Sequence, residues 1–195
     1  MKNLIIIPGL GDDARYTKFI TKNWEKNHGI KVTVMNFGWS GNDDKFQKRF
    51  DAIDKKIEKF LQENKNVSLL GISAGGSAVI NLYSKRKDQI EKVICVCGRL
   101  RDPNIGRMWN HRKKDLGVFT QSVRLAEKNI EKLNEKDLEK FLTIRPIYDD
   151  VVPVRTMTLN GAKNKKVNAI QHMISIFLIM TRYSSISAKF INSDK

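Results

Sequence analysis

A serine between two glycines is the residue pattern in this sequence most suited to covalent chemistry. The run Gly-Ile-Ser-Ala-Gly places Ser73 two positions from both Gly71 and Gly75. A serine that attacks a carbonyl must sit on a sharp turn between a strand and a helix, and glycines at these two positions avoid steric clashes there. Residues 67–70 suit a buried strand before this turn, and the small residues 74–78 suit a helix start after it. The pattern predicts that Ser73 is a nucleophile; the alternative is a glycine-rich turn without catalysis.

In this context the motif resembles that of the α/β-hydrolase family, in particular its compact members with little or no cap. The resemblance covers about residues 4–179. It implies a serine hydrolase in which an acid and then a histidine follow the nucleophile along the chain.

The resemblance implies that His172 is the base. Residues 171–176 are similar to the family's glycine-histidine followed by apolar residues, with Gln171 in place of the usual glycine. The other two histidines, His28 and His111, precede the candidate acid in the chain. His28 lies before a glycine and suits the C-terminus of a helix, and His111 is expected to be exposed.

The same resemblance implies that Asp149 is the acid. Residues 149–153, Asp-Asp-Val-Val-Pro, match the family's pattern of an aspartate, two further residues and then Val-Pro, with Asp149 in the position of the aspartate, and they follow a predicted strand. Asp150 is the fallback in the same loop. The alternative for either residue is a helix N-cap or turn aspartate before proline.

Two backbone N–H groups are expected to stabilise the negative charge that develops on the attacked oxygen. One is that of Ala74, directly after the nucleophile. By resemblance, Leu10 in the loop after the first strand supplies the other. Gly9 and Gly11 on either side of Leu10 let the backbone approach a ligand closely.

The implied reaction is acyl transfer through a Ser73–His172–Asp149 triad, with a carboxylic ester or thioester of small or medium size as the substrate. Two rival hypotheses are a non-catalytic binding protein on the same fold and a basic module for nucleic acid or another anionic surface. The substrate itself is not specified by the sequence. Three residues are candidates for lining an acyl pocket: Trp39, Met108 and Trp109.

The elements that must position these residues alternate between strand and helix, which predicts an α/β three-layer α/β/α sandwich with a mostly parallel sheet. Strands are expected at residues 4–8, 31–37, 67–70, 92–97, 141–147 and 165–170, and helices at 14–27, 44–63, after 74 and from 173 to about 183. The 195 residues are predicted to form a single domain, in which 102–141 is either a small helical cap or a connecting region. The tail after about residue 183 is expected to be loose.

Composition narrows the class of protein. The net charge is +15, which we interpret as a lysine-rich surface, because lysines alternate with acids and the largest basic cluster, 163–166, is small. No nucleic-acid partner is expected. The longest apolar block, 173–180, is too short to span a bilayer, and the N-terminus lacks a signal-peptide pattern, so a cytoplasmic protein is expected.

The two cysteines are predicted to be core thiols. Cys95 and Cys97 alternate with valines and would point to one face of a strand. Neither a metal site nor a disulfide is predicted, because other metal ligands are distant in sequence and this spacing suits bridging poorly. No cofactor is expected, and the oligomeric state is left open.

Overall fold

Six parallel strands form the centre of the molecule in a computed structural model that describes residues 1–39, 46–102 and 116–193. Their order across the sheet is β2-β1-β3-β4-β5-β6, and every neighbouring pair is parallel. The strands are β1 (Lys2–Ile7), β2 (Ile30–Val34), β3 (Val67–Ile72), β4 (Val93–Val96), β5 (Phe141–Tyr148) and β6 (Lys163–Ile170).

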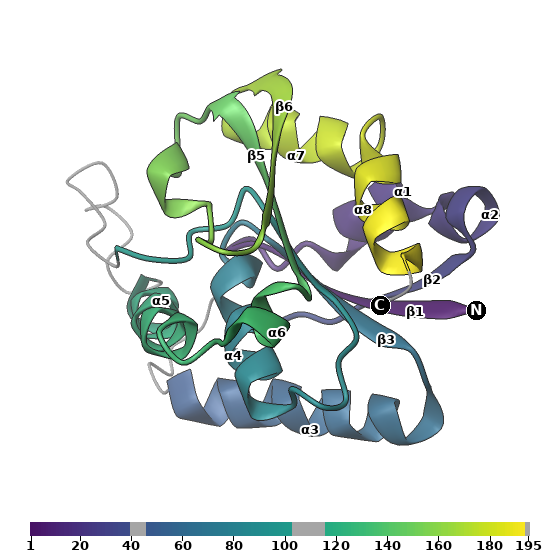
Figure 1. Cartoon of the computed structure of the whole chain (residues 1–195), viewed down its shortest axis with the longest axis vertical. Helices are drawn as coiled ribbons and strands as arrows, with labels where there is room; N and C mark the ends of the chain where they lie inside the picture. The colour runs from purple at the N-terminus through teal and green to yellow at the C-terminus, as the bar shows by residue number, and fades with distance from the viewer. Residues whose placement is uncertain (40–45, 103–115, 194–195) are drawn as a thin grey trace.

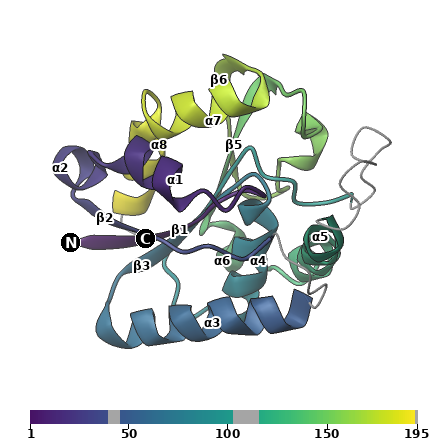
Figure 2. The same cartoon turned by 180° about the vertical axis from the view of Figure 1, so that it is seen from behind.

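Helices cover both faces of this sheet, as Figure 1 and the reverse view in Figure 2 show. One face carries α3 (Phe46–Glu63), α4 (Gly75–Lys85), α5 (Leu116–Ile130) and α6 (Glu135–Leu138). The other carries α1 (Ala14–Thr21), α2 (Trp24–His28), α7 (His172–Met180) and α8 (Ser184–Asn192). The short 3-10 helix η2 (Val154–Thr156) lies between β5 and β6. The predicted three-layer α/β/α sandwich is confirmed.

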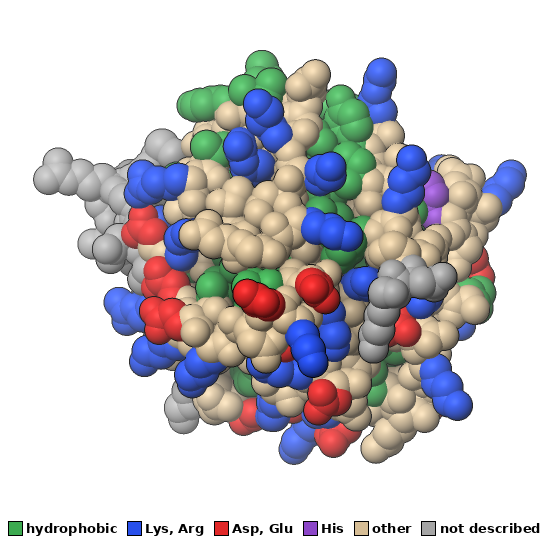
Figure 3. Space-filling model, viewed as in Figure 1, with side chains coloured by type: hydrophobic (Ala, Val, Ile, Leu, Met, Phe, Trp, Pro, Cys, Tyr) green, Lys and Arg blue, Asp and Glu red, His purple; other side chains and the backbone are tan. Residues whose placement is uncertain are grey.

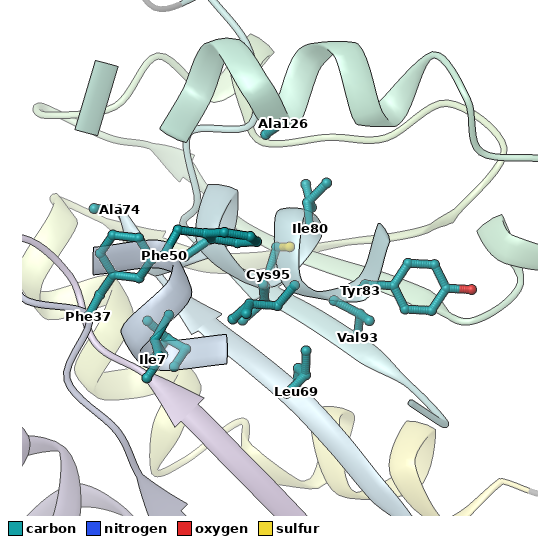
Figure 4. Close-up of a cluster of buried hydrophobic side chains, with 14 of the residues drawn as sticks. Ile7, Phe37, Phe50, Leu69, Ala74, Ile80, Tyr83, Val93, Cys95 and Ala126 are labelled. Atoms are coloured by element: carbon teal, nitrogen blue, oxygen red, sulfur yellow. The ribbon is translucent and has the colours of Figure 1, made fainter. Parts of the chain in front are cut away.

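Alternation along the strands divides the apolar core into two clusters. In β1, Ile5 and Ile7 pack with the α3, α4 and α5 face, whereas Leu4 and Ile6 pack with the opposite face. Figure 4 shows the first cluster, in which Ile7 and other strand side chains point toward the helices. Burial on both faces explains why these strands consist of nearly continuous apolar residues.

The described part of 102–141 belongs to this core. Val118, Phe119 and Val123 of α5 are buried in the same cluster as α3 and α4. Residues 116–130 therefore form part of the helical layer on this face of the sheet. Residues 103–115 lie outside the described part of the chain.

Three sequence predictions were wrong in detail. The helix expected over 14–27 is broken into α1 and α2 at residues 22–23, although Gly29 ends α2 as expected, with φ +68°. The tail is helical as α8, because Phe190 and Ile191 are buried against the sheet layer. Cys95 and Cys97 are both buried and free, but they join opposite core clusters. Cys97 lies beyond the end of β4 with φ +49°, which ends the strand alternation.

The carboxyl ends of all six strands lie at one edge of the sheet, because every strand pair is parallel. The chain leaves β1 toward one face, into α1, and leaves β3 toward the other, into α4. A crevice is expected outside the carboxyl ends of two neighbouring strands where the connections diverge in this way. The candidate nucleophile follows β3 at this position.

The turn between β3 and α4 depends on very close backbone approach. A Cβ at Gly75 would lie 2.1 Å from the carbonyl oxygen of Ile7, and a Cβ at Gly71 would lie 2.2 Å from that of Gly75. Neither position can hold a side chain unless the backbone moves. These two glycines therefore allow α4 to begin directly against β1.

No single helix among the described residues has the length and apolar character needed to cross a membrane; α7 and α8 meet that criterion only as a pair bent by 51°.

A buried ion pair holds α3 against the end of α4. Asp54 is 4% exposed, and its Oδ1 accepts from Arg86 Nε at 2.5 Å while its Oδ2 lies 2.7 Å from Lys85 Nζ. Burial alone would raise the pKa of the Asp54 carboxyl, but the bonds from Arg86 and Lys85 outweigh burial and lower that pKa below its usual value.

We expect Asp54→Asn to lower the free energy of unfolding by about 2 kcal/mol at neutral pH, since it removes the buried carboxylate that both Arg86 and Lys85 contact most closely. A lowered pKa in the folded state stabilises the protein above the unfolded-state pKa and stops doing so as the pH falls through the folded-state value. Urea unfolding should therefore show the deficit narrowing in acid. Asp51→Asn, at a half-exposed carboxylate 3.9 Å from Lys85 Nζ, is the matched control and should have little effect. Equal losses in both variants would contradict this account.

Gly75→Ala should cost about 3 kcal/mol or more of unfolding free energy, or prevent folding, because its Cβ collides with the Ile7 carbonyl. The control is Gly11→Ala: a Cβ there meets nothing within 4 Å, and the expected change is under about 1 kcal/mol. Urea titration of both variants is the measurement. A well-tolerated alanine at position 75 would show that the backbone contact is not tight.

Candidate active site

Ser73 occupies the turn directly after β3 with a left-handed backbone conformation, φ +53°. This region is uncommon for a residue with a side chain, and it persists only where surrounding structure enforces it. Here the Ser73 N–H donates to the carbonyl of Val96 at 2.9 Å, and the Ser73 carbonyl accepts from Gly76 N–H at 3.0 Å. These bonds and the glycine contacts described above fix the serine at the carboxyl edge of the sheet, where its side chain is half-buried.

His172 faces Ser73 from the first position of α7, far away in sequence. Its Nε2 lies 2.9 Å from Ser73 Oγ, and its side chain is almost fully buried. The ring is fixed through its own backbone as well, because the His172 N–H donates to Asp150 Oδ1 at 2.8 Å. The serine and histidine singled out in the sequence are thus within hydrogen-bond distance of each other.

Asp149 completes a chain of hydrogen bonds. Its Oδ2 lies 2.7 Å from His172 Nδ1, and its Oδ1 accepts from the N–H groups of Val151 and Val152 at 2.9 and 2.7 Å. With Oδ1 occupied by two donors, Oδ2 of Asp149 is the oxygen that accepts a hydrogen bond from Nδ1–H. That tautomer leaves the Nε2 lone pair facing the Ser73 hydroxyl.

Asp150, the fallback acid, has a different place. Its carboxylate bonds the N–H of His172 rather than the ring, and this bond lowers the pKa of the Asp150 carboxyl below its usual value. Asp150 therefore anchors the start of α7.

Gln171 occupies the position where the resemblance led us to expect glycine. Its φ of +73° is a left-handed conformation that glycine adopts most readily. The glutamine side chain instead accepts from Ile174 N–H at 2.8 Å and caps α7. With glutamine at position 171, His172 still begins α7 within hydrogen-bond distance of Ser73.

The loop after β1 lies beside the serine. A Cβ at Gly9 would meet Ser73 Cβ at 3.2 Å and Ser73 Oγ at 3.7 Å. Among the described residues, none accepts a hydrogen bond from the backbone N–H of Leu10 or Ala74. Leu10 follows Gly9 in this loop, and Ala74 directly follows Ser73 as the N-cap of α4.

Asp12 was not singled out in the sequence, yet it ties this loop in place. Its Oδ1 accepts from Phe37 N–H at 3.0 Å, and its Oδ2 accepts from Trp39 N–H at 2.5 Å. Burial raises the pKa of this carboxyl, against the opposing effect of those donors. Only a short acidic run after the first strand signals it in the sequence, and acidic loop residues are too common to indicate such a bond.

The remaining sequence candidates lie elsewhere or are undescribed. Trp39 is almost fully buried, stacks on Phe37 with ring centroids 4.2 Å apart and donates from Nε1 to Pro8, so it packs the loop interior. His28 ends α2 as predicted and pairs with Ser184. Residues 108, 109 and 111 lie outside the described part of the chain. Within the described residues, no group of three or more His, Cys, Asp or Glu is placed to hold a metal ion.

The sequence matches no family model and no curated protein. Solved structures with a similar fold include a monoacylglycerol lipase of Paleococcus ferrophilus (TM-score 0.66, 15% identity, 97% of this chain and 93% of that chain). Est1E from Butyrivibrio proteoclasticus aligns with TM-score 0.64 at 16% identity over 98% and 89%. The thioesterase domain from the curacin biosynthetic pathway aligns with TM-score 0.62 at 12% identity over 98% and 91%. The parallel sheet, the turn after β3 and these neighbours together show that the chain has the α/β-hydrolase fold.

Proposed function

We propose that the protein is a serine hydrolase that cleaves carboxylic esters or thioesters through an acyl-enzyme. The observation that carries this proposal is the continuous hydrogen-bond chain from Ser73 Oγ through both ring nitrogens of His172 to Asp149. The fold neighbours described as a lipase and a thioesterase support this reaction class, at identities that establish the fold alone.

In the proposed reaction, His172 Nε2 takes the proton of Ser73 as Oγ attacks the carbonyl carbon. Asp149 holds the ring in the required tautomer and stabilises the imidazolium through the 2.7 Å bond to Nδ1. The imidazolium then protonates the leaving alcohol or thiol. Water attacks the acyl-serine with the same histidine as base, which regenerates the serine.

The N–H groups of Leu10 and Ala74 are proposed to stabilise the oxyanion. The loop that carries Leu10 is fixed by the bonds from Asp12 to residues 37 and 39, and Ala74 is the N-cap of α4. Donors fixed in this way need no reorganisation when charge develops, and losing one such donor typically costs about 3 kcal/mol in the barrier.

The strained serine argues against a purely binding role. Left-handed backbone at a non-glycine residue costs on the order of 1–3 kcal/mol, and such strain concentrates at functional sites. A binding site needs neither this strain nor a histidine aligned between a hydroxyl and a carboxylate. We therefore propose catalysis over the non-catalytic alternative.

We expect Ser73→Ala and His172→Ala each to lower kcat for p-nitrophenyl acetate by about 10⁴-fold or more, because members of such a unit fail together. Labelling with a fluorophosphonate probe should disappear in Ser73→Ala. The matched control is Ser84→Ala, which removes a hydroxyl without a hydrogen-bond partner further along α4. Labelling that persists without the Ser73 hydroxyl would exclude it as the nucleophile.

Asp149→Asn and Asp150→Asn separate the two neighbouring aspartates. The first should lower kcat by about 10⁴-fold, because its amide would donate toward Nδ1 and favour the wrong tautomer. The second keeps an oxygen for the His172 N–H and should retain activity within about tenfold. Steady-state ester hydrolysis is the readout, and the reverse order of losses would make Asp150 the acid.

A further inference from the structure

Exposed apolar side chains gather at one end of the molecule. Eight large hydrophobic side chains are exposed among the described residues, and six of them lie between residues 147 and 177. We call these six the apolar rim: Ile147, Tyr148, Ile170, Met173, Ile174 and Phe177. Each is 42% to 62% exposed, so the rim is not a set of core residues seen at their edges.

The members of the rim come from three elements that contact one another, β5, β6 and α7. Tyr148 and Ile170 are register partners at the ends of β5 and β6. Met173, Ile174 and Phe177 follow on α7 at spacings of three and four residues, which places them along one helix face. Figure 3 shows hydrophobic side chains gathered at the upper edge, above the ends of these strands.

Helix α7 carries apolar side chains on its exposed outer face as well as on the face that packs against the sheet. Its inner face, including Ile176, Ile179 and Met180, is buried against the sheet, while the rim residues on its outer face meet solvent. A surface helix of a water-soluble domain usually carries polar residues on that outer face. Uncovered apolar surface of this kind marks an interaction site.

The rim borders the candidate active site. Tyr148 directly precedes Asp149, and Met173 directly follows His172. A partner seated on the rim would therefore lie beside the hydrogen-bond chain to Ser73.

The surroundings of the rim are cationic. The two strands that end at the rim, β5 and β6, contain Arg145, Lys165 and Lys166 and no Asp or Glu. Arg145 on β5 and Lys166 on β6 are register partners, and Arg145 lies two residues before Ile147. Figure 3 shows Lys and Arg side chains near the upper edge, whereas acidic side chains lie across the middle and lower parts of that face.

From this combination we propose that the apolar rim docks the protein on an anionic lipid surface, with the candidate active site facing the lipid; this orientation of the site toward an ester rests on the proposed function. Aliphatic side chains insert at the boundary between headgroups and acyl chains, and cations beside them are attracted by anionic headgroups. Nucleic acid would leave Ile147, Ile170 and Ile174 without an apolar partner. A second copy of this chain docked on the same face would place its Arg145 and Lys166 near those of the first copy, and these like charges would repel.

The test is flotation of the full-length protein with vesicles of phosphatidylglycerol and phosphatidylcholine, or of phosphatidylcholine alone. The parent should partition at least about tenfold more strongly onto the anionic vesicles, and less so at high salt. Ile174→Ser with Phe177→Ser should lower that partition at least about tenfold. Phe19→Ser, at a residue of α1 that is at least as exposed, is the control and should change the partition by less than about twofold.

A second pair of variants isolates the charge. Arg145→Glu with Lys166→Glu should lower binding to anionic vesicles at least about tenfold, whereas Lys55→Glu with Lys56→Glu, on the exposed face of α3, should have a much smaller effect. Thermal unfolding by circular dichroism checks that each variant is folded. If Ile174→Ser/Phe177→Ser does not fold, the binding of Arg145→Glu/Lys166→Glu alone tests the docking proposal.

The outcomes separate docking from catalysis. Hydrolysis of soluble p-nitrophenyl acetate should be unchanged in the rim variants, while hydrolysis of an ester lipid in anionic vesicles should fall with binding. Vesicle binding without any ester hydrolysis by the parent would remove the proposed function and keep the docking surface. No anionic preference, equal binding by Ile174→Ser/Phe177→Ser and the parent, or a dimer in sedimentation that these substitutions abolish would each overturn the docking proposal.

Discussion

The close passage of α4 over β1 is the constraint on which the rest of the site depends. Because a Cβ at Gly75 would meet the Ile7 carbonyl at 2.1 Å, the chain can turn from β3 into α4 only through glycine at that position. The same turn forces Ser73 into the left-handed region and presents its hydroxyl at the edge of the sheet. The loop after β1 then passes so close to the serine that a Cβ at Gly9 would meet Ser73 Cβ at 3.2 Å.

The second half of the site is assembled by elements that fold onto the opposite face. α7 packs against the sheet on the side away from α4, and its first residue reaches the edge where Ser73 lies. Two neighbouring aspartates have different hydrogen-bond partners there. Asp149 orients the imidazole and Asp150 holds the helix backbone, so ring and helix are fixed independently. The same helix carries the outer apolar residues that border the site, which links its position to the proposed lipid contact.

Much of this arrangement could be predicted from the sequence, because it depends on local patterns. Apolar blocks predicted the strands, and glycine spacing together with chain order selected the serine, histidine and aspartate that the fold brings together. The sequence predictions were wrong or incomplete where the local structure depends on tertiary packing. The α8 helix is short and polar at its start, and only burial of Phe190 and Ile191 shows why it is ordered. Cys97 changes face because of one left-handed residue after β4, and the Asp12 bonds join loops that are distant in sequence.

The most direct test of the central claim is a crystal structure of the protein after reaction with an alkyl fluorophosphonate. The account predicts phosphorus bonded to Ser73 Oγ, with the phosphonyl oxygen about 2.7–3.1 Å from the backbone nitrogens of both Leu10 and Ala74. His172 should remain between the modified serine and Asp149. Phosphorus on a different residue, or a phosphonyl oxygen turned toward solvent and away from both N–H groups, would contradict the account.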